Sequence, residues 1–292
     1  MSGHVPVLLK ETLSALALHS GDDVIDGTLG GGGHASAILE AIGPAGRLLG
    51  IEWDSRTLEE TRKSLERFGS RAVLVHANYR DMGRLARTYD FPSVSAILLD
   101  LGYSSLQIDD PERGFSFRFA GPLDMRYDEE SDRPTAADIL NSWPQADLAH
   151  ILREYGEEGA AGRISAAIVE ARRHRPIETA DALVKLVTQV VGRGKGKINP
   201  ATQTFQALRI AVNGEFDNLR AALPEAVKLL NPGGRLAVIA FHSIEDRIVK
   251  EFFRDCPDLE VITKRPLVAA EEEVDDNRRS RSAKLRVAVR RT

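Results

Sequence analysis

The residues of this chain that could do chemistry stand where short apolar runs end. Asp100 closes the run Val94–Asp100, and Tyr103 follows it by three residues. A carboxylate and a neighbouring backbone carbonyl can accept the protons of an exocyclic amine on a base ring and turn its lone pair toward a methyl group. An aromatic side chain beside them can stack on the base. The pattern predicts Asp100 and Tyr103 as catalytic residues; the alternative is that Asp100 caps a turn and Tyr103 only packs.

A glycine-rich stretch, Val24–His34, is a second candidate feature. Its four consecutive glycines, 30–33, stand between a short apolar run and an expected helix. Glycine permits positive φ and close approach of the backbone to a ligand, and a helix start favours an anionic group. Glu52 follows Gly32 at the spacing of an acid that holds ribose hydroxyls. The same pattern fits a dinucleotide site or a turn that only packs, so it leaves the cofactor open.

Other polar residues also follow apolar runs: Asp26, Asp54, Asn78 and Tyr79. Ligands of open parallel sheets bind beyond the carboxyl ends of the strands. Tyr79 could stack on adenine, or it could be an aromatic residue at the rim of the site. Asp54 is expected to be an acid at the start of a helix, and Ser55 is expected to be the N-cap of that helix. Ser243 is expected to be the N-cap of a later helix, 244–254.

The apolar runs predict the sheet that brings these residues together. Helix-length segments separate the first four runs, so the strands should be parallel with helices on both faces. A fifth run should follow a turn at 231–234, and the last two runs should form an antiparallel hairpin at the sheet edge. This arrangement favours a methyltransferase-type sheet over a dehydrogenase. The expected strands are 24–26, 47–53, 72–76, 94–100, 235–241, 259–263 and 285–289.

The middle of the chain shows helical periodicity without a buried strand. It predicts an all-helical domain, 108–203, inserted between the two parts of the sheet domain, 1–107 and 204–292. The expected helices of the inserted domain are 136–140, 146–155, 159–173 and 180–191. Those of the sheet domain are 10–16, 34–42, 55–68, 202–211, 218–230 and 244–254.

The composition limits the class of protein. One cysteine, Cys256, excludes a disulfide framework and a cysteine-rich zinc site, and neither His34 nor His242 has a ligand set at metal-binding spacing, so no metal is expected. The chain shows no signal pattern and no run of transmembrane length, which favours a cytoplasmic protein without a membrane partner. Whether it forms a homodimer is left open.

Basic residues gather in three clusters although the net charge is −4. The clusters, 172–175, 193–197 and 278–281, favour an anionic partner, although each alone could be a solvated face. A loop, 113–119, interleaves phenylalanines with arginines, as suits unpaired bases and phosphates; the alternative is an interdomain loop with buried phenylalanines. RNA contacts are expected at Arg113, Phe115, Arg118, Arg172, Arg173 and Arg175.

Several long motifs of the chain resemble those of the RsmH (MraW) family, the bacterial small-subunit rRNA cytosine-N4 methyltransferases. The resemblance runs from His4 to the C-terminus. It implies a Rossmann-like class I methyltransferase sheet with an inserted helical domain, S-adenosyl-L-methionine as methyl donor, and methylation of a decoding-region cytidine in 16S rRNA of the small ribosomal subunit. The segments that carry it include 26–34, 104–107, 113–117, 122–126, 204–210, 212–213, 241–247 and 279–284.

The resemblance also implies which residues bind the cofactor. The family's positions fall on Gly32, Gly33, His34, Glu52, Tyr79, Asp100 and Gln107. Glu52 stands where aspartate is usual, which lengthens the reach to the ribose by one methylene. Tyr103 stands where a small aliphatic residue is usual, so its stacking role rests on this sequence alone. Two alternatives to the enzyme are an RNA-binding module that keeps the cofactor fold without catalysis and a nicotinamide-dependent oxidoreductase.

Overall fold

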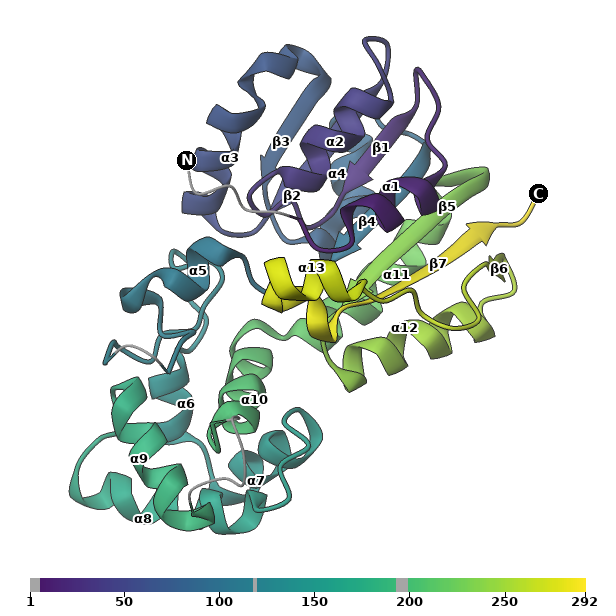
Figure 1. The fold of residues 1–292 in the computed structure, drawn as a ribbon. Helices are drawn as coiled ribbons and strands as arrows, with labels where there is room; N and C mark the ends of the chain where they lie inside the picture. The colour runs from purple at the N-terminus through teal and green to yellow at the C-terminus, as the bar shows by residue number, and fades with distance from the viewer. Residues whose placement is uncertain (1–5, 118–119, 193–198) are drawn as a thin grey trace. The chain divides into compact units, whose positions relative to one another are not determined.

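The computed structural model describes residues 6–117, 120–192 and 199–292, which form two compact units (Figure 1). The first, the sheet unit, combines Met1–Ser104 with Phe216–Thr292. The second, the helical unit, is Ser105–Glu215. The chain therefore leaves the sheet unit once and returns to it, as expected for an inserted domain.

The sheet unit is built on seven strands in the order β3-β2-β1-β4-β5-β7-β6. The first five strands of this order are parallel to one another, and β7 runs antiparallel to both β5 and β6. The predicted parallel sheet and its antiparallel edge hairpin are confirmed. The strands are β1 (Asp23–Asp26), β2 (Arg47–Glu52), β3 (Ala72–His76), β4 (Val94–Asp100), β5 (Leu230–Ala240), β6 (Leu259–Val261) and β7 (Lys284–Arg290).

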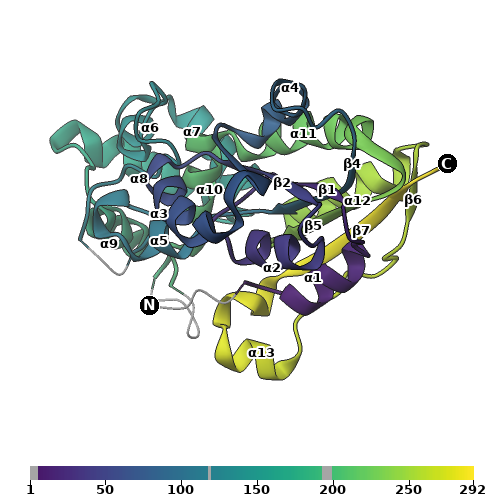
Figure 2. The same ribbon diagram turned by 90° about the horizontal axis from the view of Figure 1, so that it is seen from above.

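Helices cover both faces of this sheet (Figure 2). Successive strand residues point to opposite faces, so Leu98 and Leu99 of β4 enter different cores. One core joins the strands to α1 and α2, and the other joins them to α4, α11 and α12. The helices are α1 (Leu9–Leu16), α2 (Gly33–Ala41), α3 (Ser55–Leu65), α4 (Met82–Thr88), α11 (Glu215–Leu229), α12 (Ser243–Asp255) and α13 (Glu271–Asp276), with the 3-10 turns η1 (Glu66–Arg71), η2 (Tyr79–Asp81) and η4 (Arg278–Ser282).

Local expectations for the sheet unit were wrong at the start of α3 and at the start of β5. The N-cap of α3 is Asp54, whose carboxylate accepts from the amides of Arg56 and Thr57, because Ser55 is already the first helical residue. The turn expected at 231–234 lies inside β5, where pairing with β4 shifts from Val94↔Leu230 to Ala96↔Arg235. The extra residues of β5 form a bulge, so the strand begins before the glycines instead of after them.

The helical unit has its own core. Its helices are α5 (Ser105–Asp109), α6 (Ala136–Ser142), α7 (Gln145–Glu154), α8 (Ala161–His174), α9 (Ala180–Val191) and α10 (Thr202–Asn213), with the 3-10 turn η3 (Pro111–Arg113). Phe205 and Leu208 of α10 pack with Ile139 of α6 and Leu152 of α7. The helix that was expected to open the second part of the sheet domain therefore belongs to the helical unit. Periodicity reveals which face of a helix is apolar, but not which core that face joins.

No helix in the described ranges combines the length and the apolar content needed to cross a membrane.

Candidate active site

Three acids end adjacent strands at the same edge of the sheet unit. In the middle, β1 places Asp26 opposite Gly50 of β2 and Leu98 of β4. Glu52 and Asp100 each come two residues further along their own strands. The parallel register thus gathers the acids that the sequence singled out at the carboxyl end of the sheet, where ligands of such folds bind.

The glycine turn between β1 and α2 is tied to the neighbouring strand and helix. The amide of Gly30 donates to Glu52 Oε2 at 2.8 Å, and its carbonyl accepts from Thr61 Oγ1 at 2.6 Å. Gly32 has a φ of 77°, and a Cβ there would lie 2.7 Å from Thr61 Cγ2. On Gly33, a Cβ would lie 2.3 Å from Pro6 Cγ. Close packing alone therefore requires glycine at both positions, so the glycine run has a structural role as well.

Glu52 is held from both sides by backbone amides. Its Oε1 accepts from Asp54 N at 2.9 Å, and its Oε2 accepts from Gly30 N. Burial raises the pKa of Glu52 to about 7, and the charge of Asp54 adds to the effect, although the two amides oppose it. Since each carboxylate oxygen can accept more than one hydrogen bond, both oxygens can still accept from hydroxyl groups of a ligand.

The backbone of Asp100 is held by a hydrogen bond, whereas one oxygen of its carboxylate has no hydrogen-bond donor among the described residues. Its amide donates to Thr28 Oγ1 at 2.5 Å, and its Oδ2 lies 3.6 Å from His34 Nδ1. Its Oδ1 is buried with no hydrogen-bond partner among the described residues, and the same holds for Asp26 Oδ2. A buried polar atom without a partner costs free energy. These two oxygens are therefore the atoms of this edge best placed to gain a donor from a ligand.

The pKa of Asp100 is raised well above its usual value. Burial is the main cause, and the charges of Asp26 and Glu245 add to it, whereas the positive charge of Arg279 opposes it. Burial also raises the pKa of Asp26 to about 7, partly offset by its hydrogen bond from Thr28 N, with a contribution from Glu52. The ionised forms of these carboxyl groups are therefore disfavoured in the free protein, and a cationic ligand at this edge would stabilise them.

His34, Tyr79 and Tyr103 are the other aromatic or imidazole side chains that the sequence predicts at this site. The His34 ring is 6% exposed, and its Nε2 lies 3.1 Å from the carbonyl oxygen of Val7. Tyr79 follows Asn78, whose side chain caps η2 by accepting from Arg80 N, as expected of a polar residue at a strand end. Tyr103 is partly buried and follows Gly102, which has a φ of 98°.

Two charged residues near Asp100 had no predicted role at this site. Glu245, 2% exposed, accepts from Phe241 N at 2.9 Å and forms a capping box with His242, which is the N-cap of α12 in place of the expected Ser243. Arg279 lies in η4, about 180 residues after Asp100. The strand-end rule, applied to β5 as well, would have indicated Glu245. Arg279 stands in the predicted basic cluster 278–281, but its place near Asp100 could not be predicted, because it depends on the pairing of β7 with β5.

In the helical unit, the structure gives several expected RNA contacts an internal role. Arg113 is 2% exposed and donates to the carbonyl oxygens of Arg126 and Tyr127 at 2.9 and 3.0 Å. Phe115 is buried and stacks on Tyr127 with ring centroids 5.6 Å apart. We therefore leave Arg113 and Phe115 out of the RNA surface. Gln107 is buried on α5. Arg118 and Phe119, as well as the basic cluster 193–197, lie outside the described residues.

The basic cluster at the end of α8 divides in the same way. Arg172 donates to the carbonyl oxygens of Leu140 and Trp143, both at 2.8 Å, and thereby caps the end of α6. Arg173 is exposed and pairs with Glu170 at 2.7 Å, and Arg175 is exposed. Only Arg173 and Arg175 present their charges at the surface, so Arg172 is also withdrawn from the predicted contacts.

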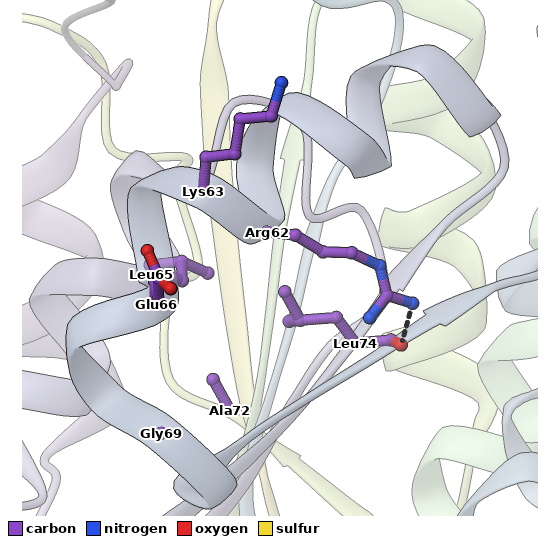
Figure 3. Close-up of a pocket in the computed structure, with 7 residues that line it drawn as sticks. All are labelled: Arg62, Lys63, Leu65, Glu66, Gly69, Ala72 and Leu74. Carbon is purple, nitrogen blue, oxygen red and sulfur yellow. Dashed lines mark hydrogen bonds between the residues drawn. The ribbon is translucent and has the colours of Figure 1, made fainter.

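The described residues outside the acidic edge include a pocket that has a different set of lining residues. A pocket of about 330 Å³ lies between α3, η1 and β3 (Figure 3), but none of the predicted site residues lines it. Its Arg62 donates to the carbonyl oxygen of Leu74 at 2.8 Å. Within the same residues, no three His, Cys, Asp or Glu side chains are grouped to hold a metal ion.

The sheet order, the glycine turn after β1 and the acids that end β1, β2 and β4 define a class I methyltransferase that depends on S-adenosylmethionine. Comparison with known families agrees: the chain belongs to the MraW methylase family, whose sequence model matches residues 1–291. This confirms the resemblance found in the sequence and removes the nicotinamide-dependent oxidoreductase as an alternative.

Similar proteins cover nearly the whole chain. One from Thermomicrobium roseum, named ribosomal RNA small subunit methyltransferase H, is 49% identical over 98% of this chain and 93% of its own length. One of the same name from Syntrophotalea carbinolica is 46% identical over 99% of this chain and 98% of its own length.

Proposed function

We propose that this protein transfers a methyl group from S-adenosylmethionine to the N4 amino group of a decoding-region cytidine in 16S rRNA of the small ribosomal subunit. Support comes from the family and from relatives named small subunit rRNA methyltransferases. The observation that carries the chemistry is the buried Oδ1 of Asp100, which has no hydrogen-bond partner among the described residues.

The acidic edge of the sheet unit fits the methyl donor. S-adenosylmethionine carries a positive sulfonium, amino groups and two ribose hydroxyls. This edge offers two buried carboxylate oxygens, Asp26 Oδ2 and Asp100 Oδ1, to which no described residue donates a hydrogen bond. Glu52 keeps free acceptor positions for the ribose hydroxyls. When bound, the cofactor supplies an electrophilic methyl group. The residues of the sheet unit that we assign to it are Gly32, Gly33, His34, Glu52, Tyr79 and Asp100. Gln107, which the family resemblance also implies, stays a prediction from the sequence.

The catalytic role that we assign to Asp100 is acceptance of a proton from N4. The N4 lone pair is delocalised into the cytosine ring, so the amine becomes nucleophilic only when acceptors turn that pair out of the plane. As the methyl group moves to N4, one of the two N4 protons must leave. An ionised Asp100 whose pKa is raised by burial is a stronger base than an exposed aspartate, and it can take this proton. The carbonyls of Leu101 and Gly102 are the nearest alternatives along the chain.

Stacking on the target base is the role that we assign to Tyr103. Its ring lies in the segment that leaves β4 directly after Asp100. A base stacked on an aromatic ring loses rotational freedom, which would hold N4 in reach of an acceptor. Of the RNA contacts predicted in the helical unit, we keep Arg173 and Arg175, because both are exposed cations.

A methyl-transfer assay tests the proposed function. The protein is incubated with methyl-labelled S-adenosylmethionine and either assembled small subunits or naked 16S rRNA, and the digested RNA is analysed for modified nucleosides. We expect label in N4-methylcytidine with at least one of the two substrates. Label in another nucleoside would overturn the assignment of N4. RNA binding without any transfer would support the non-catalytic RNA-binding module instead.

A further inference from the structure

We propose that η4, the turn Arg278–Ser282, is a phosphate-binding site for the RNA strand next to the target nucleotide. The proposal rests on the proposed function, because it concerns the same RNA substrate. It assigns a role to the basic cluster at 278–281, which neither the cofactor site nor the catalytic residues use.

The sheet register brings η4 to the edge where Asp100 lies. Lys284, the first residue of β7, pairs with Ala240, the last residue of β5. Ile239, one residue earlier in β5, pairs with Asp100 at the end of β4. The chain just before Lys284 therefore enters the sheet at the carboxyl ends of β4 and β5. In Figure 1, the yellow helix α13 and the turn that follows it lie beside the start of β7.

The structure of η4 directs two arginines into solvent. Ser280 is 1% exposed, and both its amide and its hydroxyl donate to the carbonyl oxygen of Asn277. Ala283 is likewise buried. With the turn anchored through these two small residues, Arg278 and Arg281 are exposed. Two cations are thus presented from a short, well-anchored turn instead of a loose tail.

These two arginines differ from the basic residues that follow them. Arg286 is 7% exposed and binds Asp246 through two hydrogen bonds of 2.6 and 3.2 Å, and Lys284 lies 3.5 Å from the same aspartate. No such acidic partner is found for Arg278 or Arg281 within the described ranges. Their charges remain available for an anion from outside the chain.

Arg279 stands between the two exposed arginines and connects η4 to Asp100. It is partly buried, and it lies close enough to Asp100 for its positive charge to act on the pKa of that carboxyl group. A phosphate held by Arg278 and Arg281 would therefore lie near the nucleotide whose N4 faces Asp100. Glu271 and Glu272 of α13 are exposed and would repel a polyanion, which confines the strand to the arginine side of this segment.

The test compares two matched pairs of substitutions. Arg278→Gln with Arg281→Gln removes two charges at η4. Arg84→Gln with Arg87→Gln removes two charges from exposed positions on α4, which returns the chain from the carboxyl end of β3 to the amino end of β4. RNA affinity is measured over a range of salt concentrations. A phosphate contact on a single strand contributes about 0.7 to the slope of log affinity against log salt, so the η4 pair should lower it by about 1.4 and weaken binding about tenfold near 0.15 M salt.

The other measurements separate a binding site from structural damage. Methyl transfer at saturating RNA, affinity for S-adenosylmethionine and thermal stability should be unchanged in the η4 pair, and the α4 pair should match the wild type throughout. Arg278→Lys with Arg281→Lys keeps the charges and should largely restore RNA binding. An unchanged salt slope in the η4 glutamine pair, or an equal loss in the α4 pair, would overturn the phosphate site. Absence of N4-methylcytidine with the wild-type protein would instead overturn the proposed function.

Discussion

Asp100 shows how strongly a side chain depends on its place in the fold. Its carboxylate oxygen Oδ2 lies 3.6 Å from His34 Nδ1. The other oxygen, Oδ1, is buried and has no hydrogen-bond donor among the described residues. We predict that Asp100→Asn lowers the single-turnover rate of methyl transfer by about 10²-fold or more, the effect of removing a positioned acid–base group. The measurement is made at saturating cofactor and RNA, so that binding does not enter the comparison.

Thermal unfolding of Asp100→Asn serves as the control for this prediction. The substitution keeps the size of the side chain and leaves the backbone hydrogen bond to Thr28 Oγ1 in place. A rate close to that of the wild type would mean that Asp100 only positions the cofactor. The proton acceptor would then have to be sought among the carbonyls of the Leu101–Gly102 segment.

Asp26 should make the stability of the protein depend on pH. Its side chain is 1% exposed, and its pKa is raised from 3.8 to about 7 in the folded protein. Between these two values the folded state binds more protons than the unfolded state, so this group makes the free energy of unfolding fall as pH rises. We predict that Asp26→Asn removes this loss. The stability of the variant relative to the wild type should increase by on the order of 2 kcal/mol between pH 5 and pH 8.

Denaturant unfolding at a series of pH values, without cofactor, measures the Asp26 effect. The informative quantity is the change in the difference with pH, because the amide introduced at position 26 has its own constant cost. A difference that stays flat from pH 5 to pH 8 would show that Asp26 is not protonated in the folded protein near neutral pH.

At the scale of the element, the glycine turn joins packing to ligand binding. Gly32 and Gly69 both have positive φ, 77° and 57°, but a Cβ on Gly32 would meet Thr61 whereas one on Gly69 would meet nothing within 4 Å. With a ψ of −137°, Gly69 has a backbone conformation that other residues rarely adopt, so Gly69→Ala should cost only this backbone strain, about 1–3 kcal/mol. Gly32→Ala should cost more and should also weaken binding of S-adenosylmethionine. Denaturant unfolding and calorimetry compare the two variants, and equal effects would argue against a special role for Gly32.

Element boundaries illustrate how far local sequence signals reach. Both ends of the strand at 94–100 were predicted correctly. A strand that is buried on both faces of a parallel sheet is a nearly continuous apolar run, so the polar residues beside the run mark its ends. The caps of α3 and α12 were each misplaced by one residue, since Asp54 and Ser55, or His242 and Ser243, are both plausible caps by type. Only the backbone conformation distinguishes the cap from the first helical residue.

At the scale of the whole molecule, the structure of the helical unit separates arginines that could contact RNA from an arginine that stabilises the fold, which the sequence alone does not distinguish. We predict that Arg173→Gln with Arg175→Gln lowers RNA affinity and reduces its salt dependence, because both charges are exposed. Arg172→Gln should instead destabilise the helical unit, because its guanidinium donates to the carbonyls of Leu140 and Trp143. Salt-dependent RNA binding and thermal unfolding separate the two effects. An unaltered salt slope in the double variant would count against RNA contact at this cluster.

The sequence by itself determined the parts of this protein that depend on local order. Apolar runs separated by helix-length segments predict a parallel sheet, and a glycine turn with an acid at the end of the next strand predicts a nucleotide-type site. The motifs were distinctive enough to identify the family. These inferences held because the period of a strand, the φ of a glycine and the end of an apolar run are all properties of neighbouring residues.

The tertiary structure decided which side chains are free to act. Arg113, Arg172 and Arg279 are alike in the sequence, but the first two donate to carbonyls inside the helical unit and the third lies near Asp100. It also decided that α10 joins the helical core and that β7 enters the sheet beside β5. Each of these outcomes depends on contacts between residues far apart in the chain, and residue type and spacing carry no information about which distant partner a side chain meets.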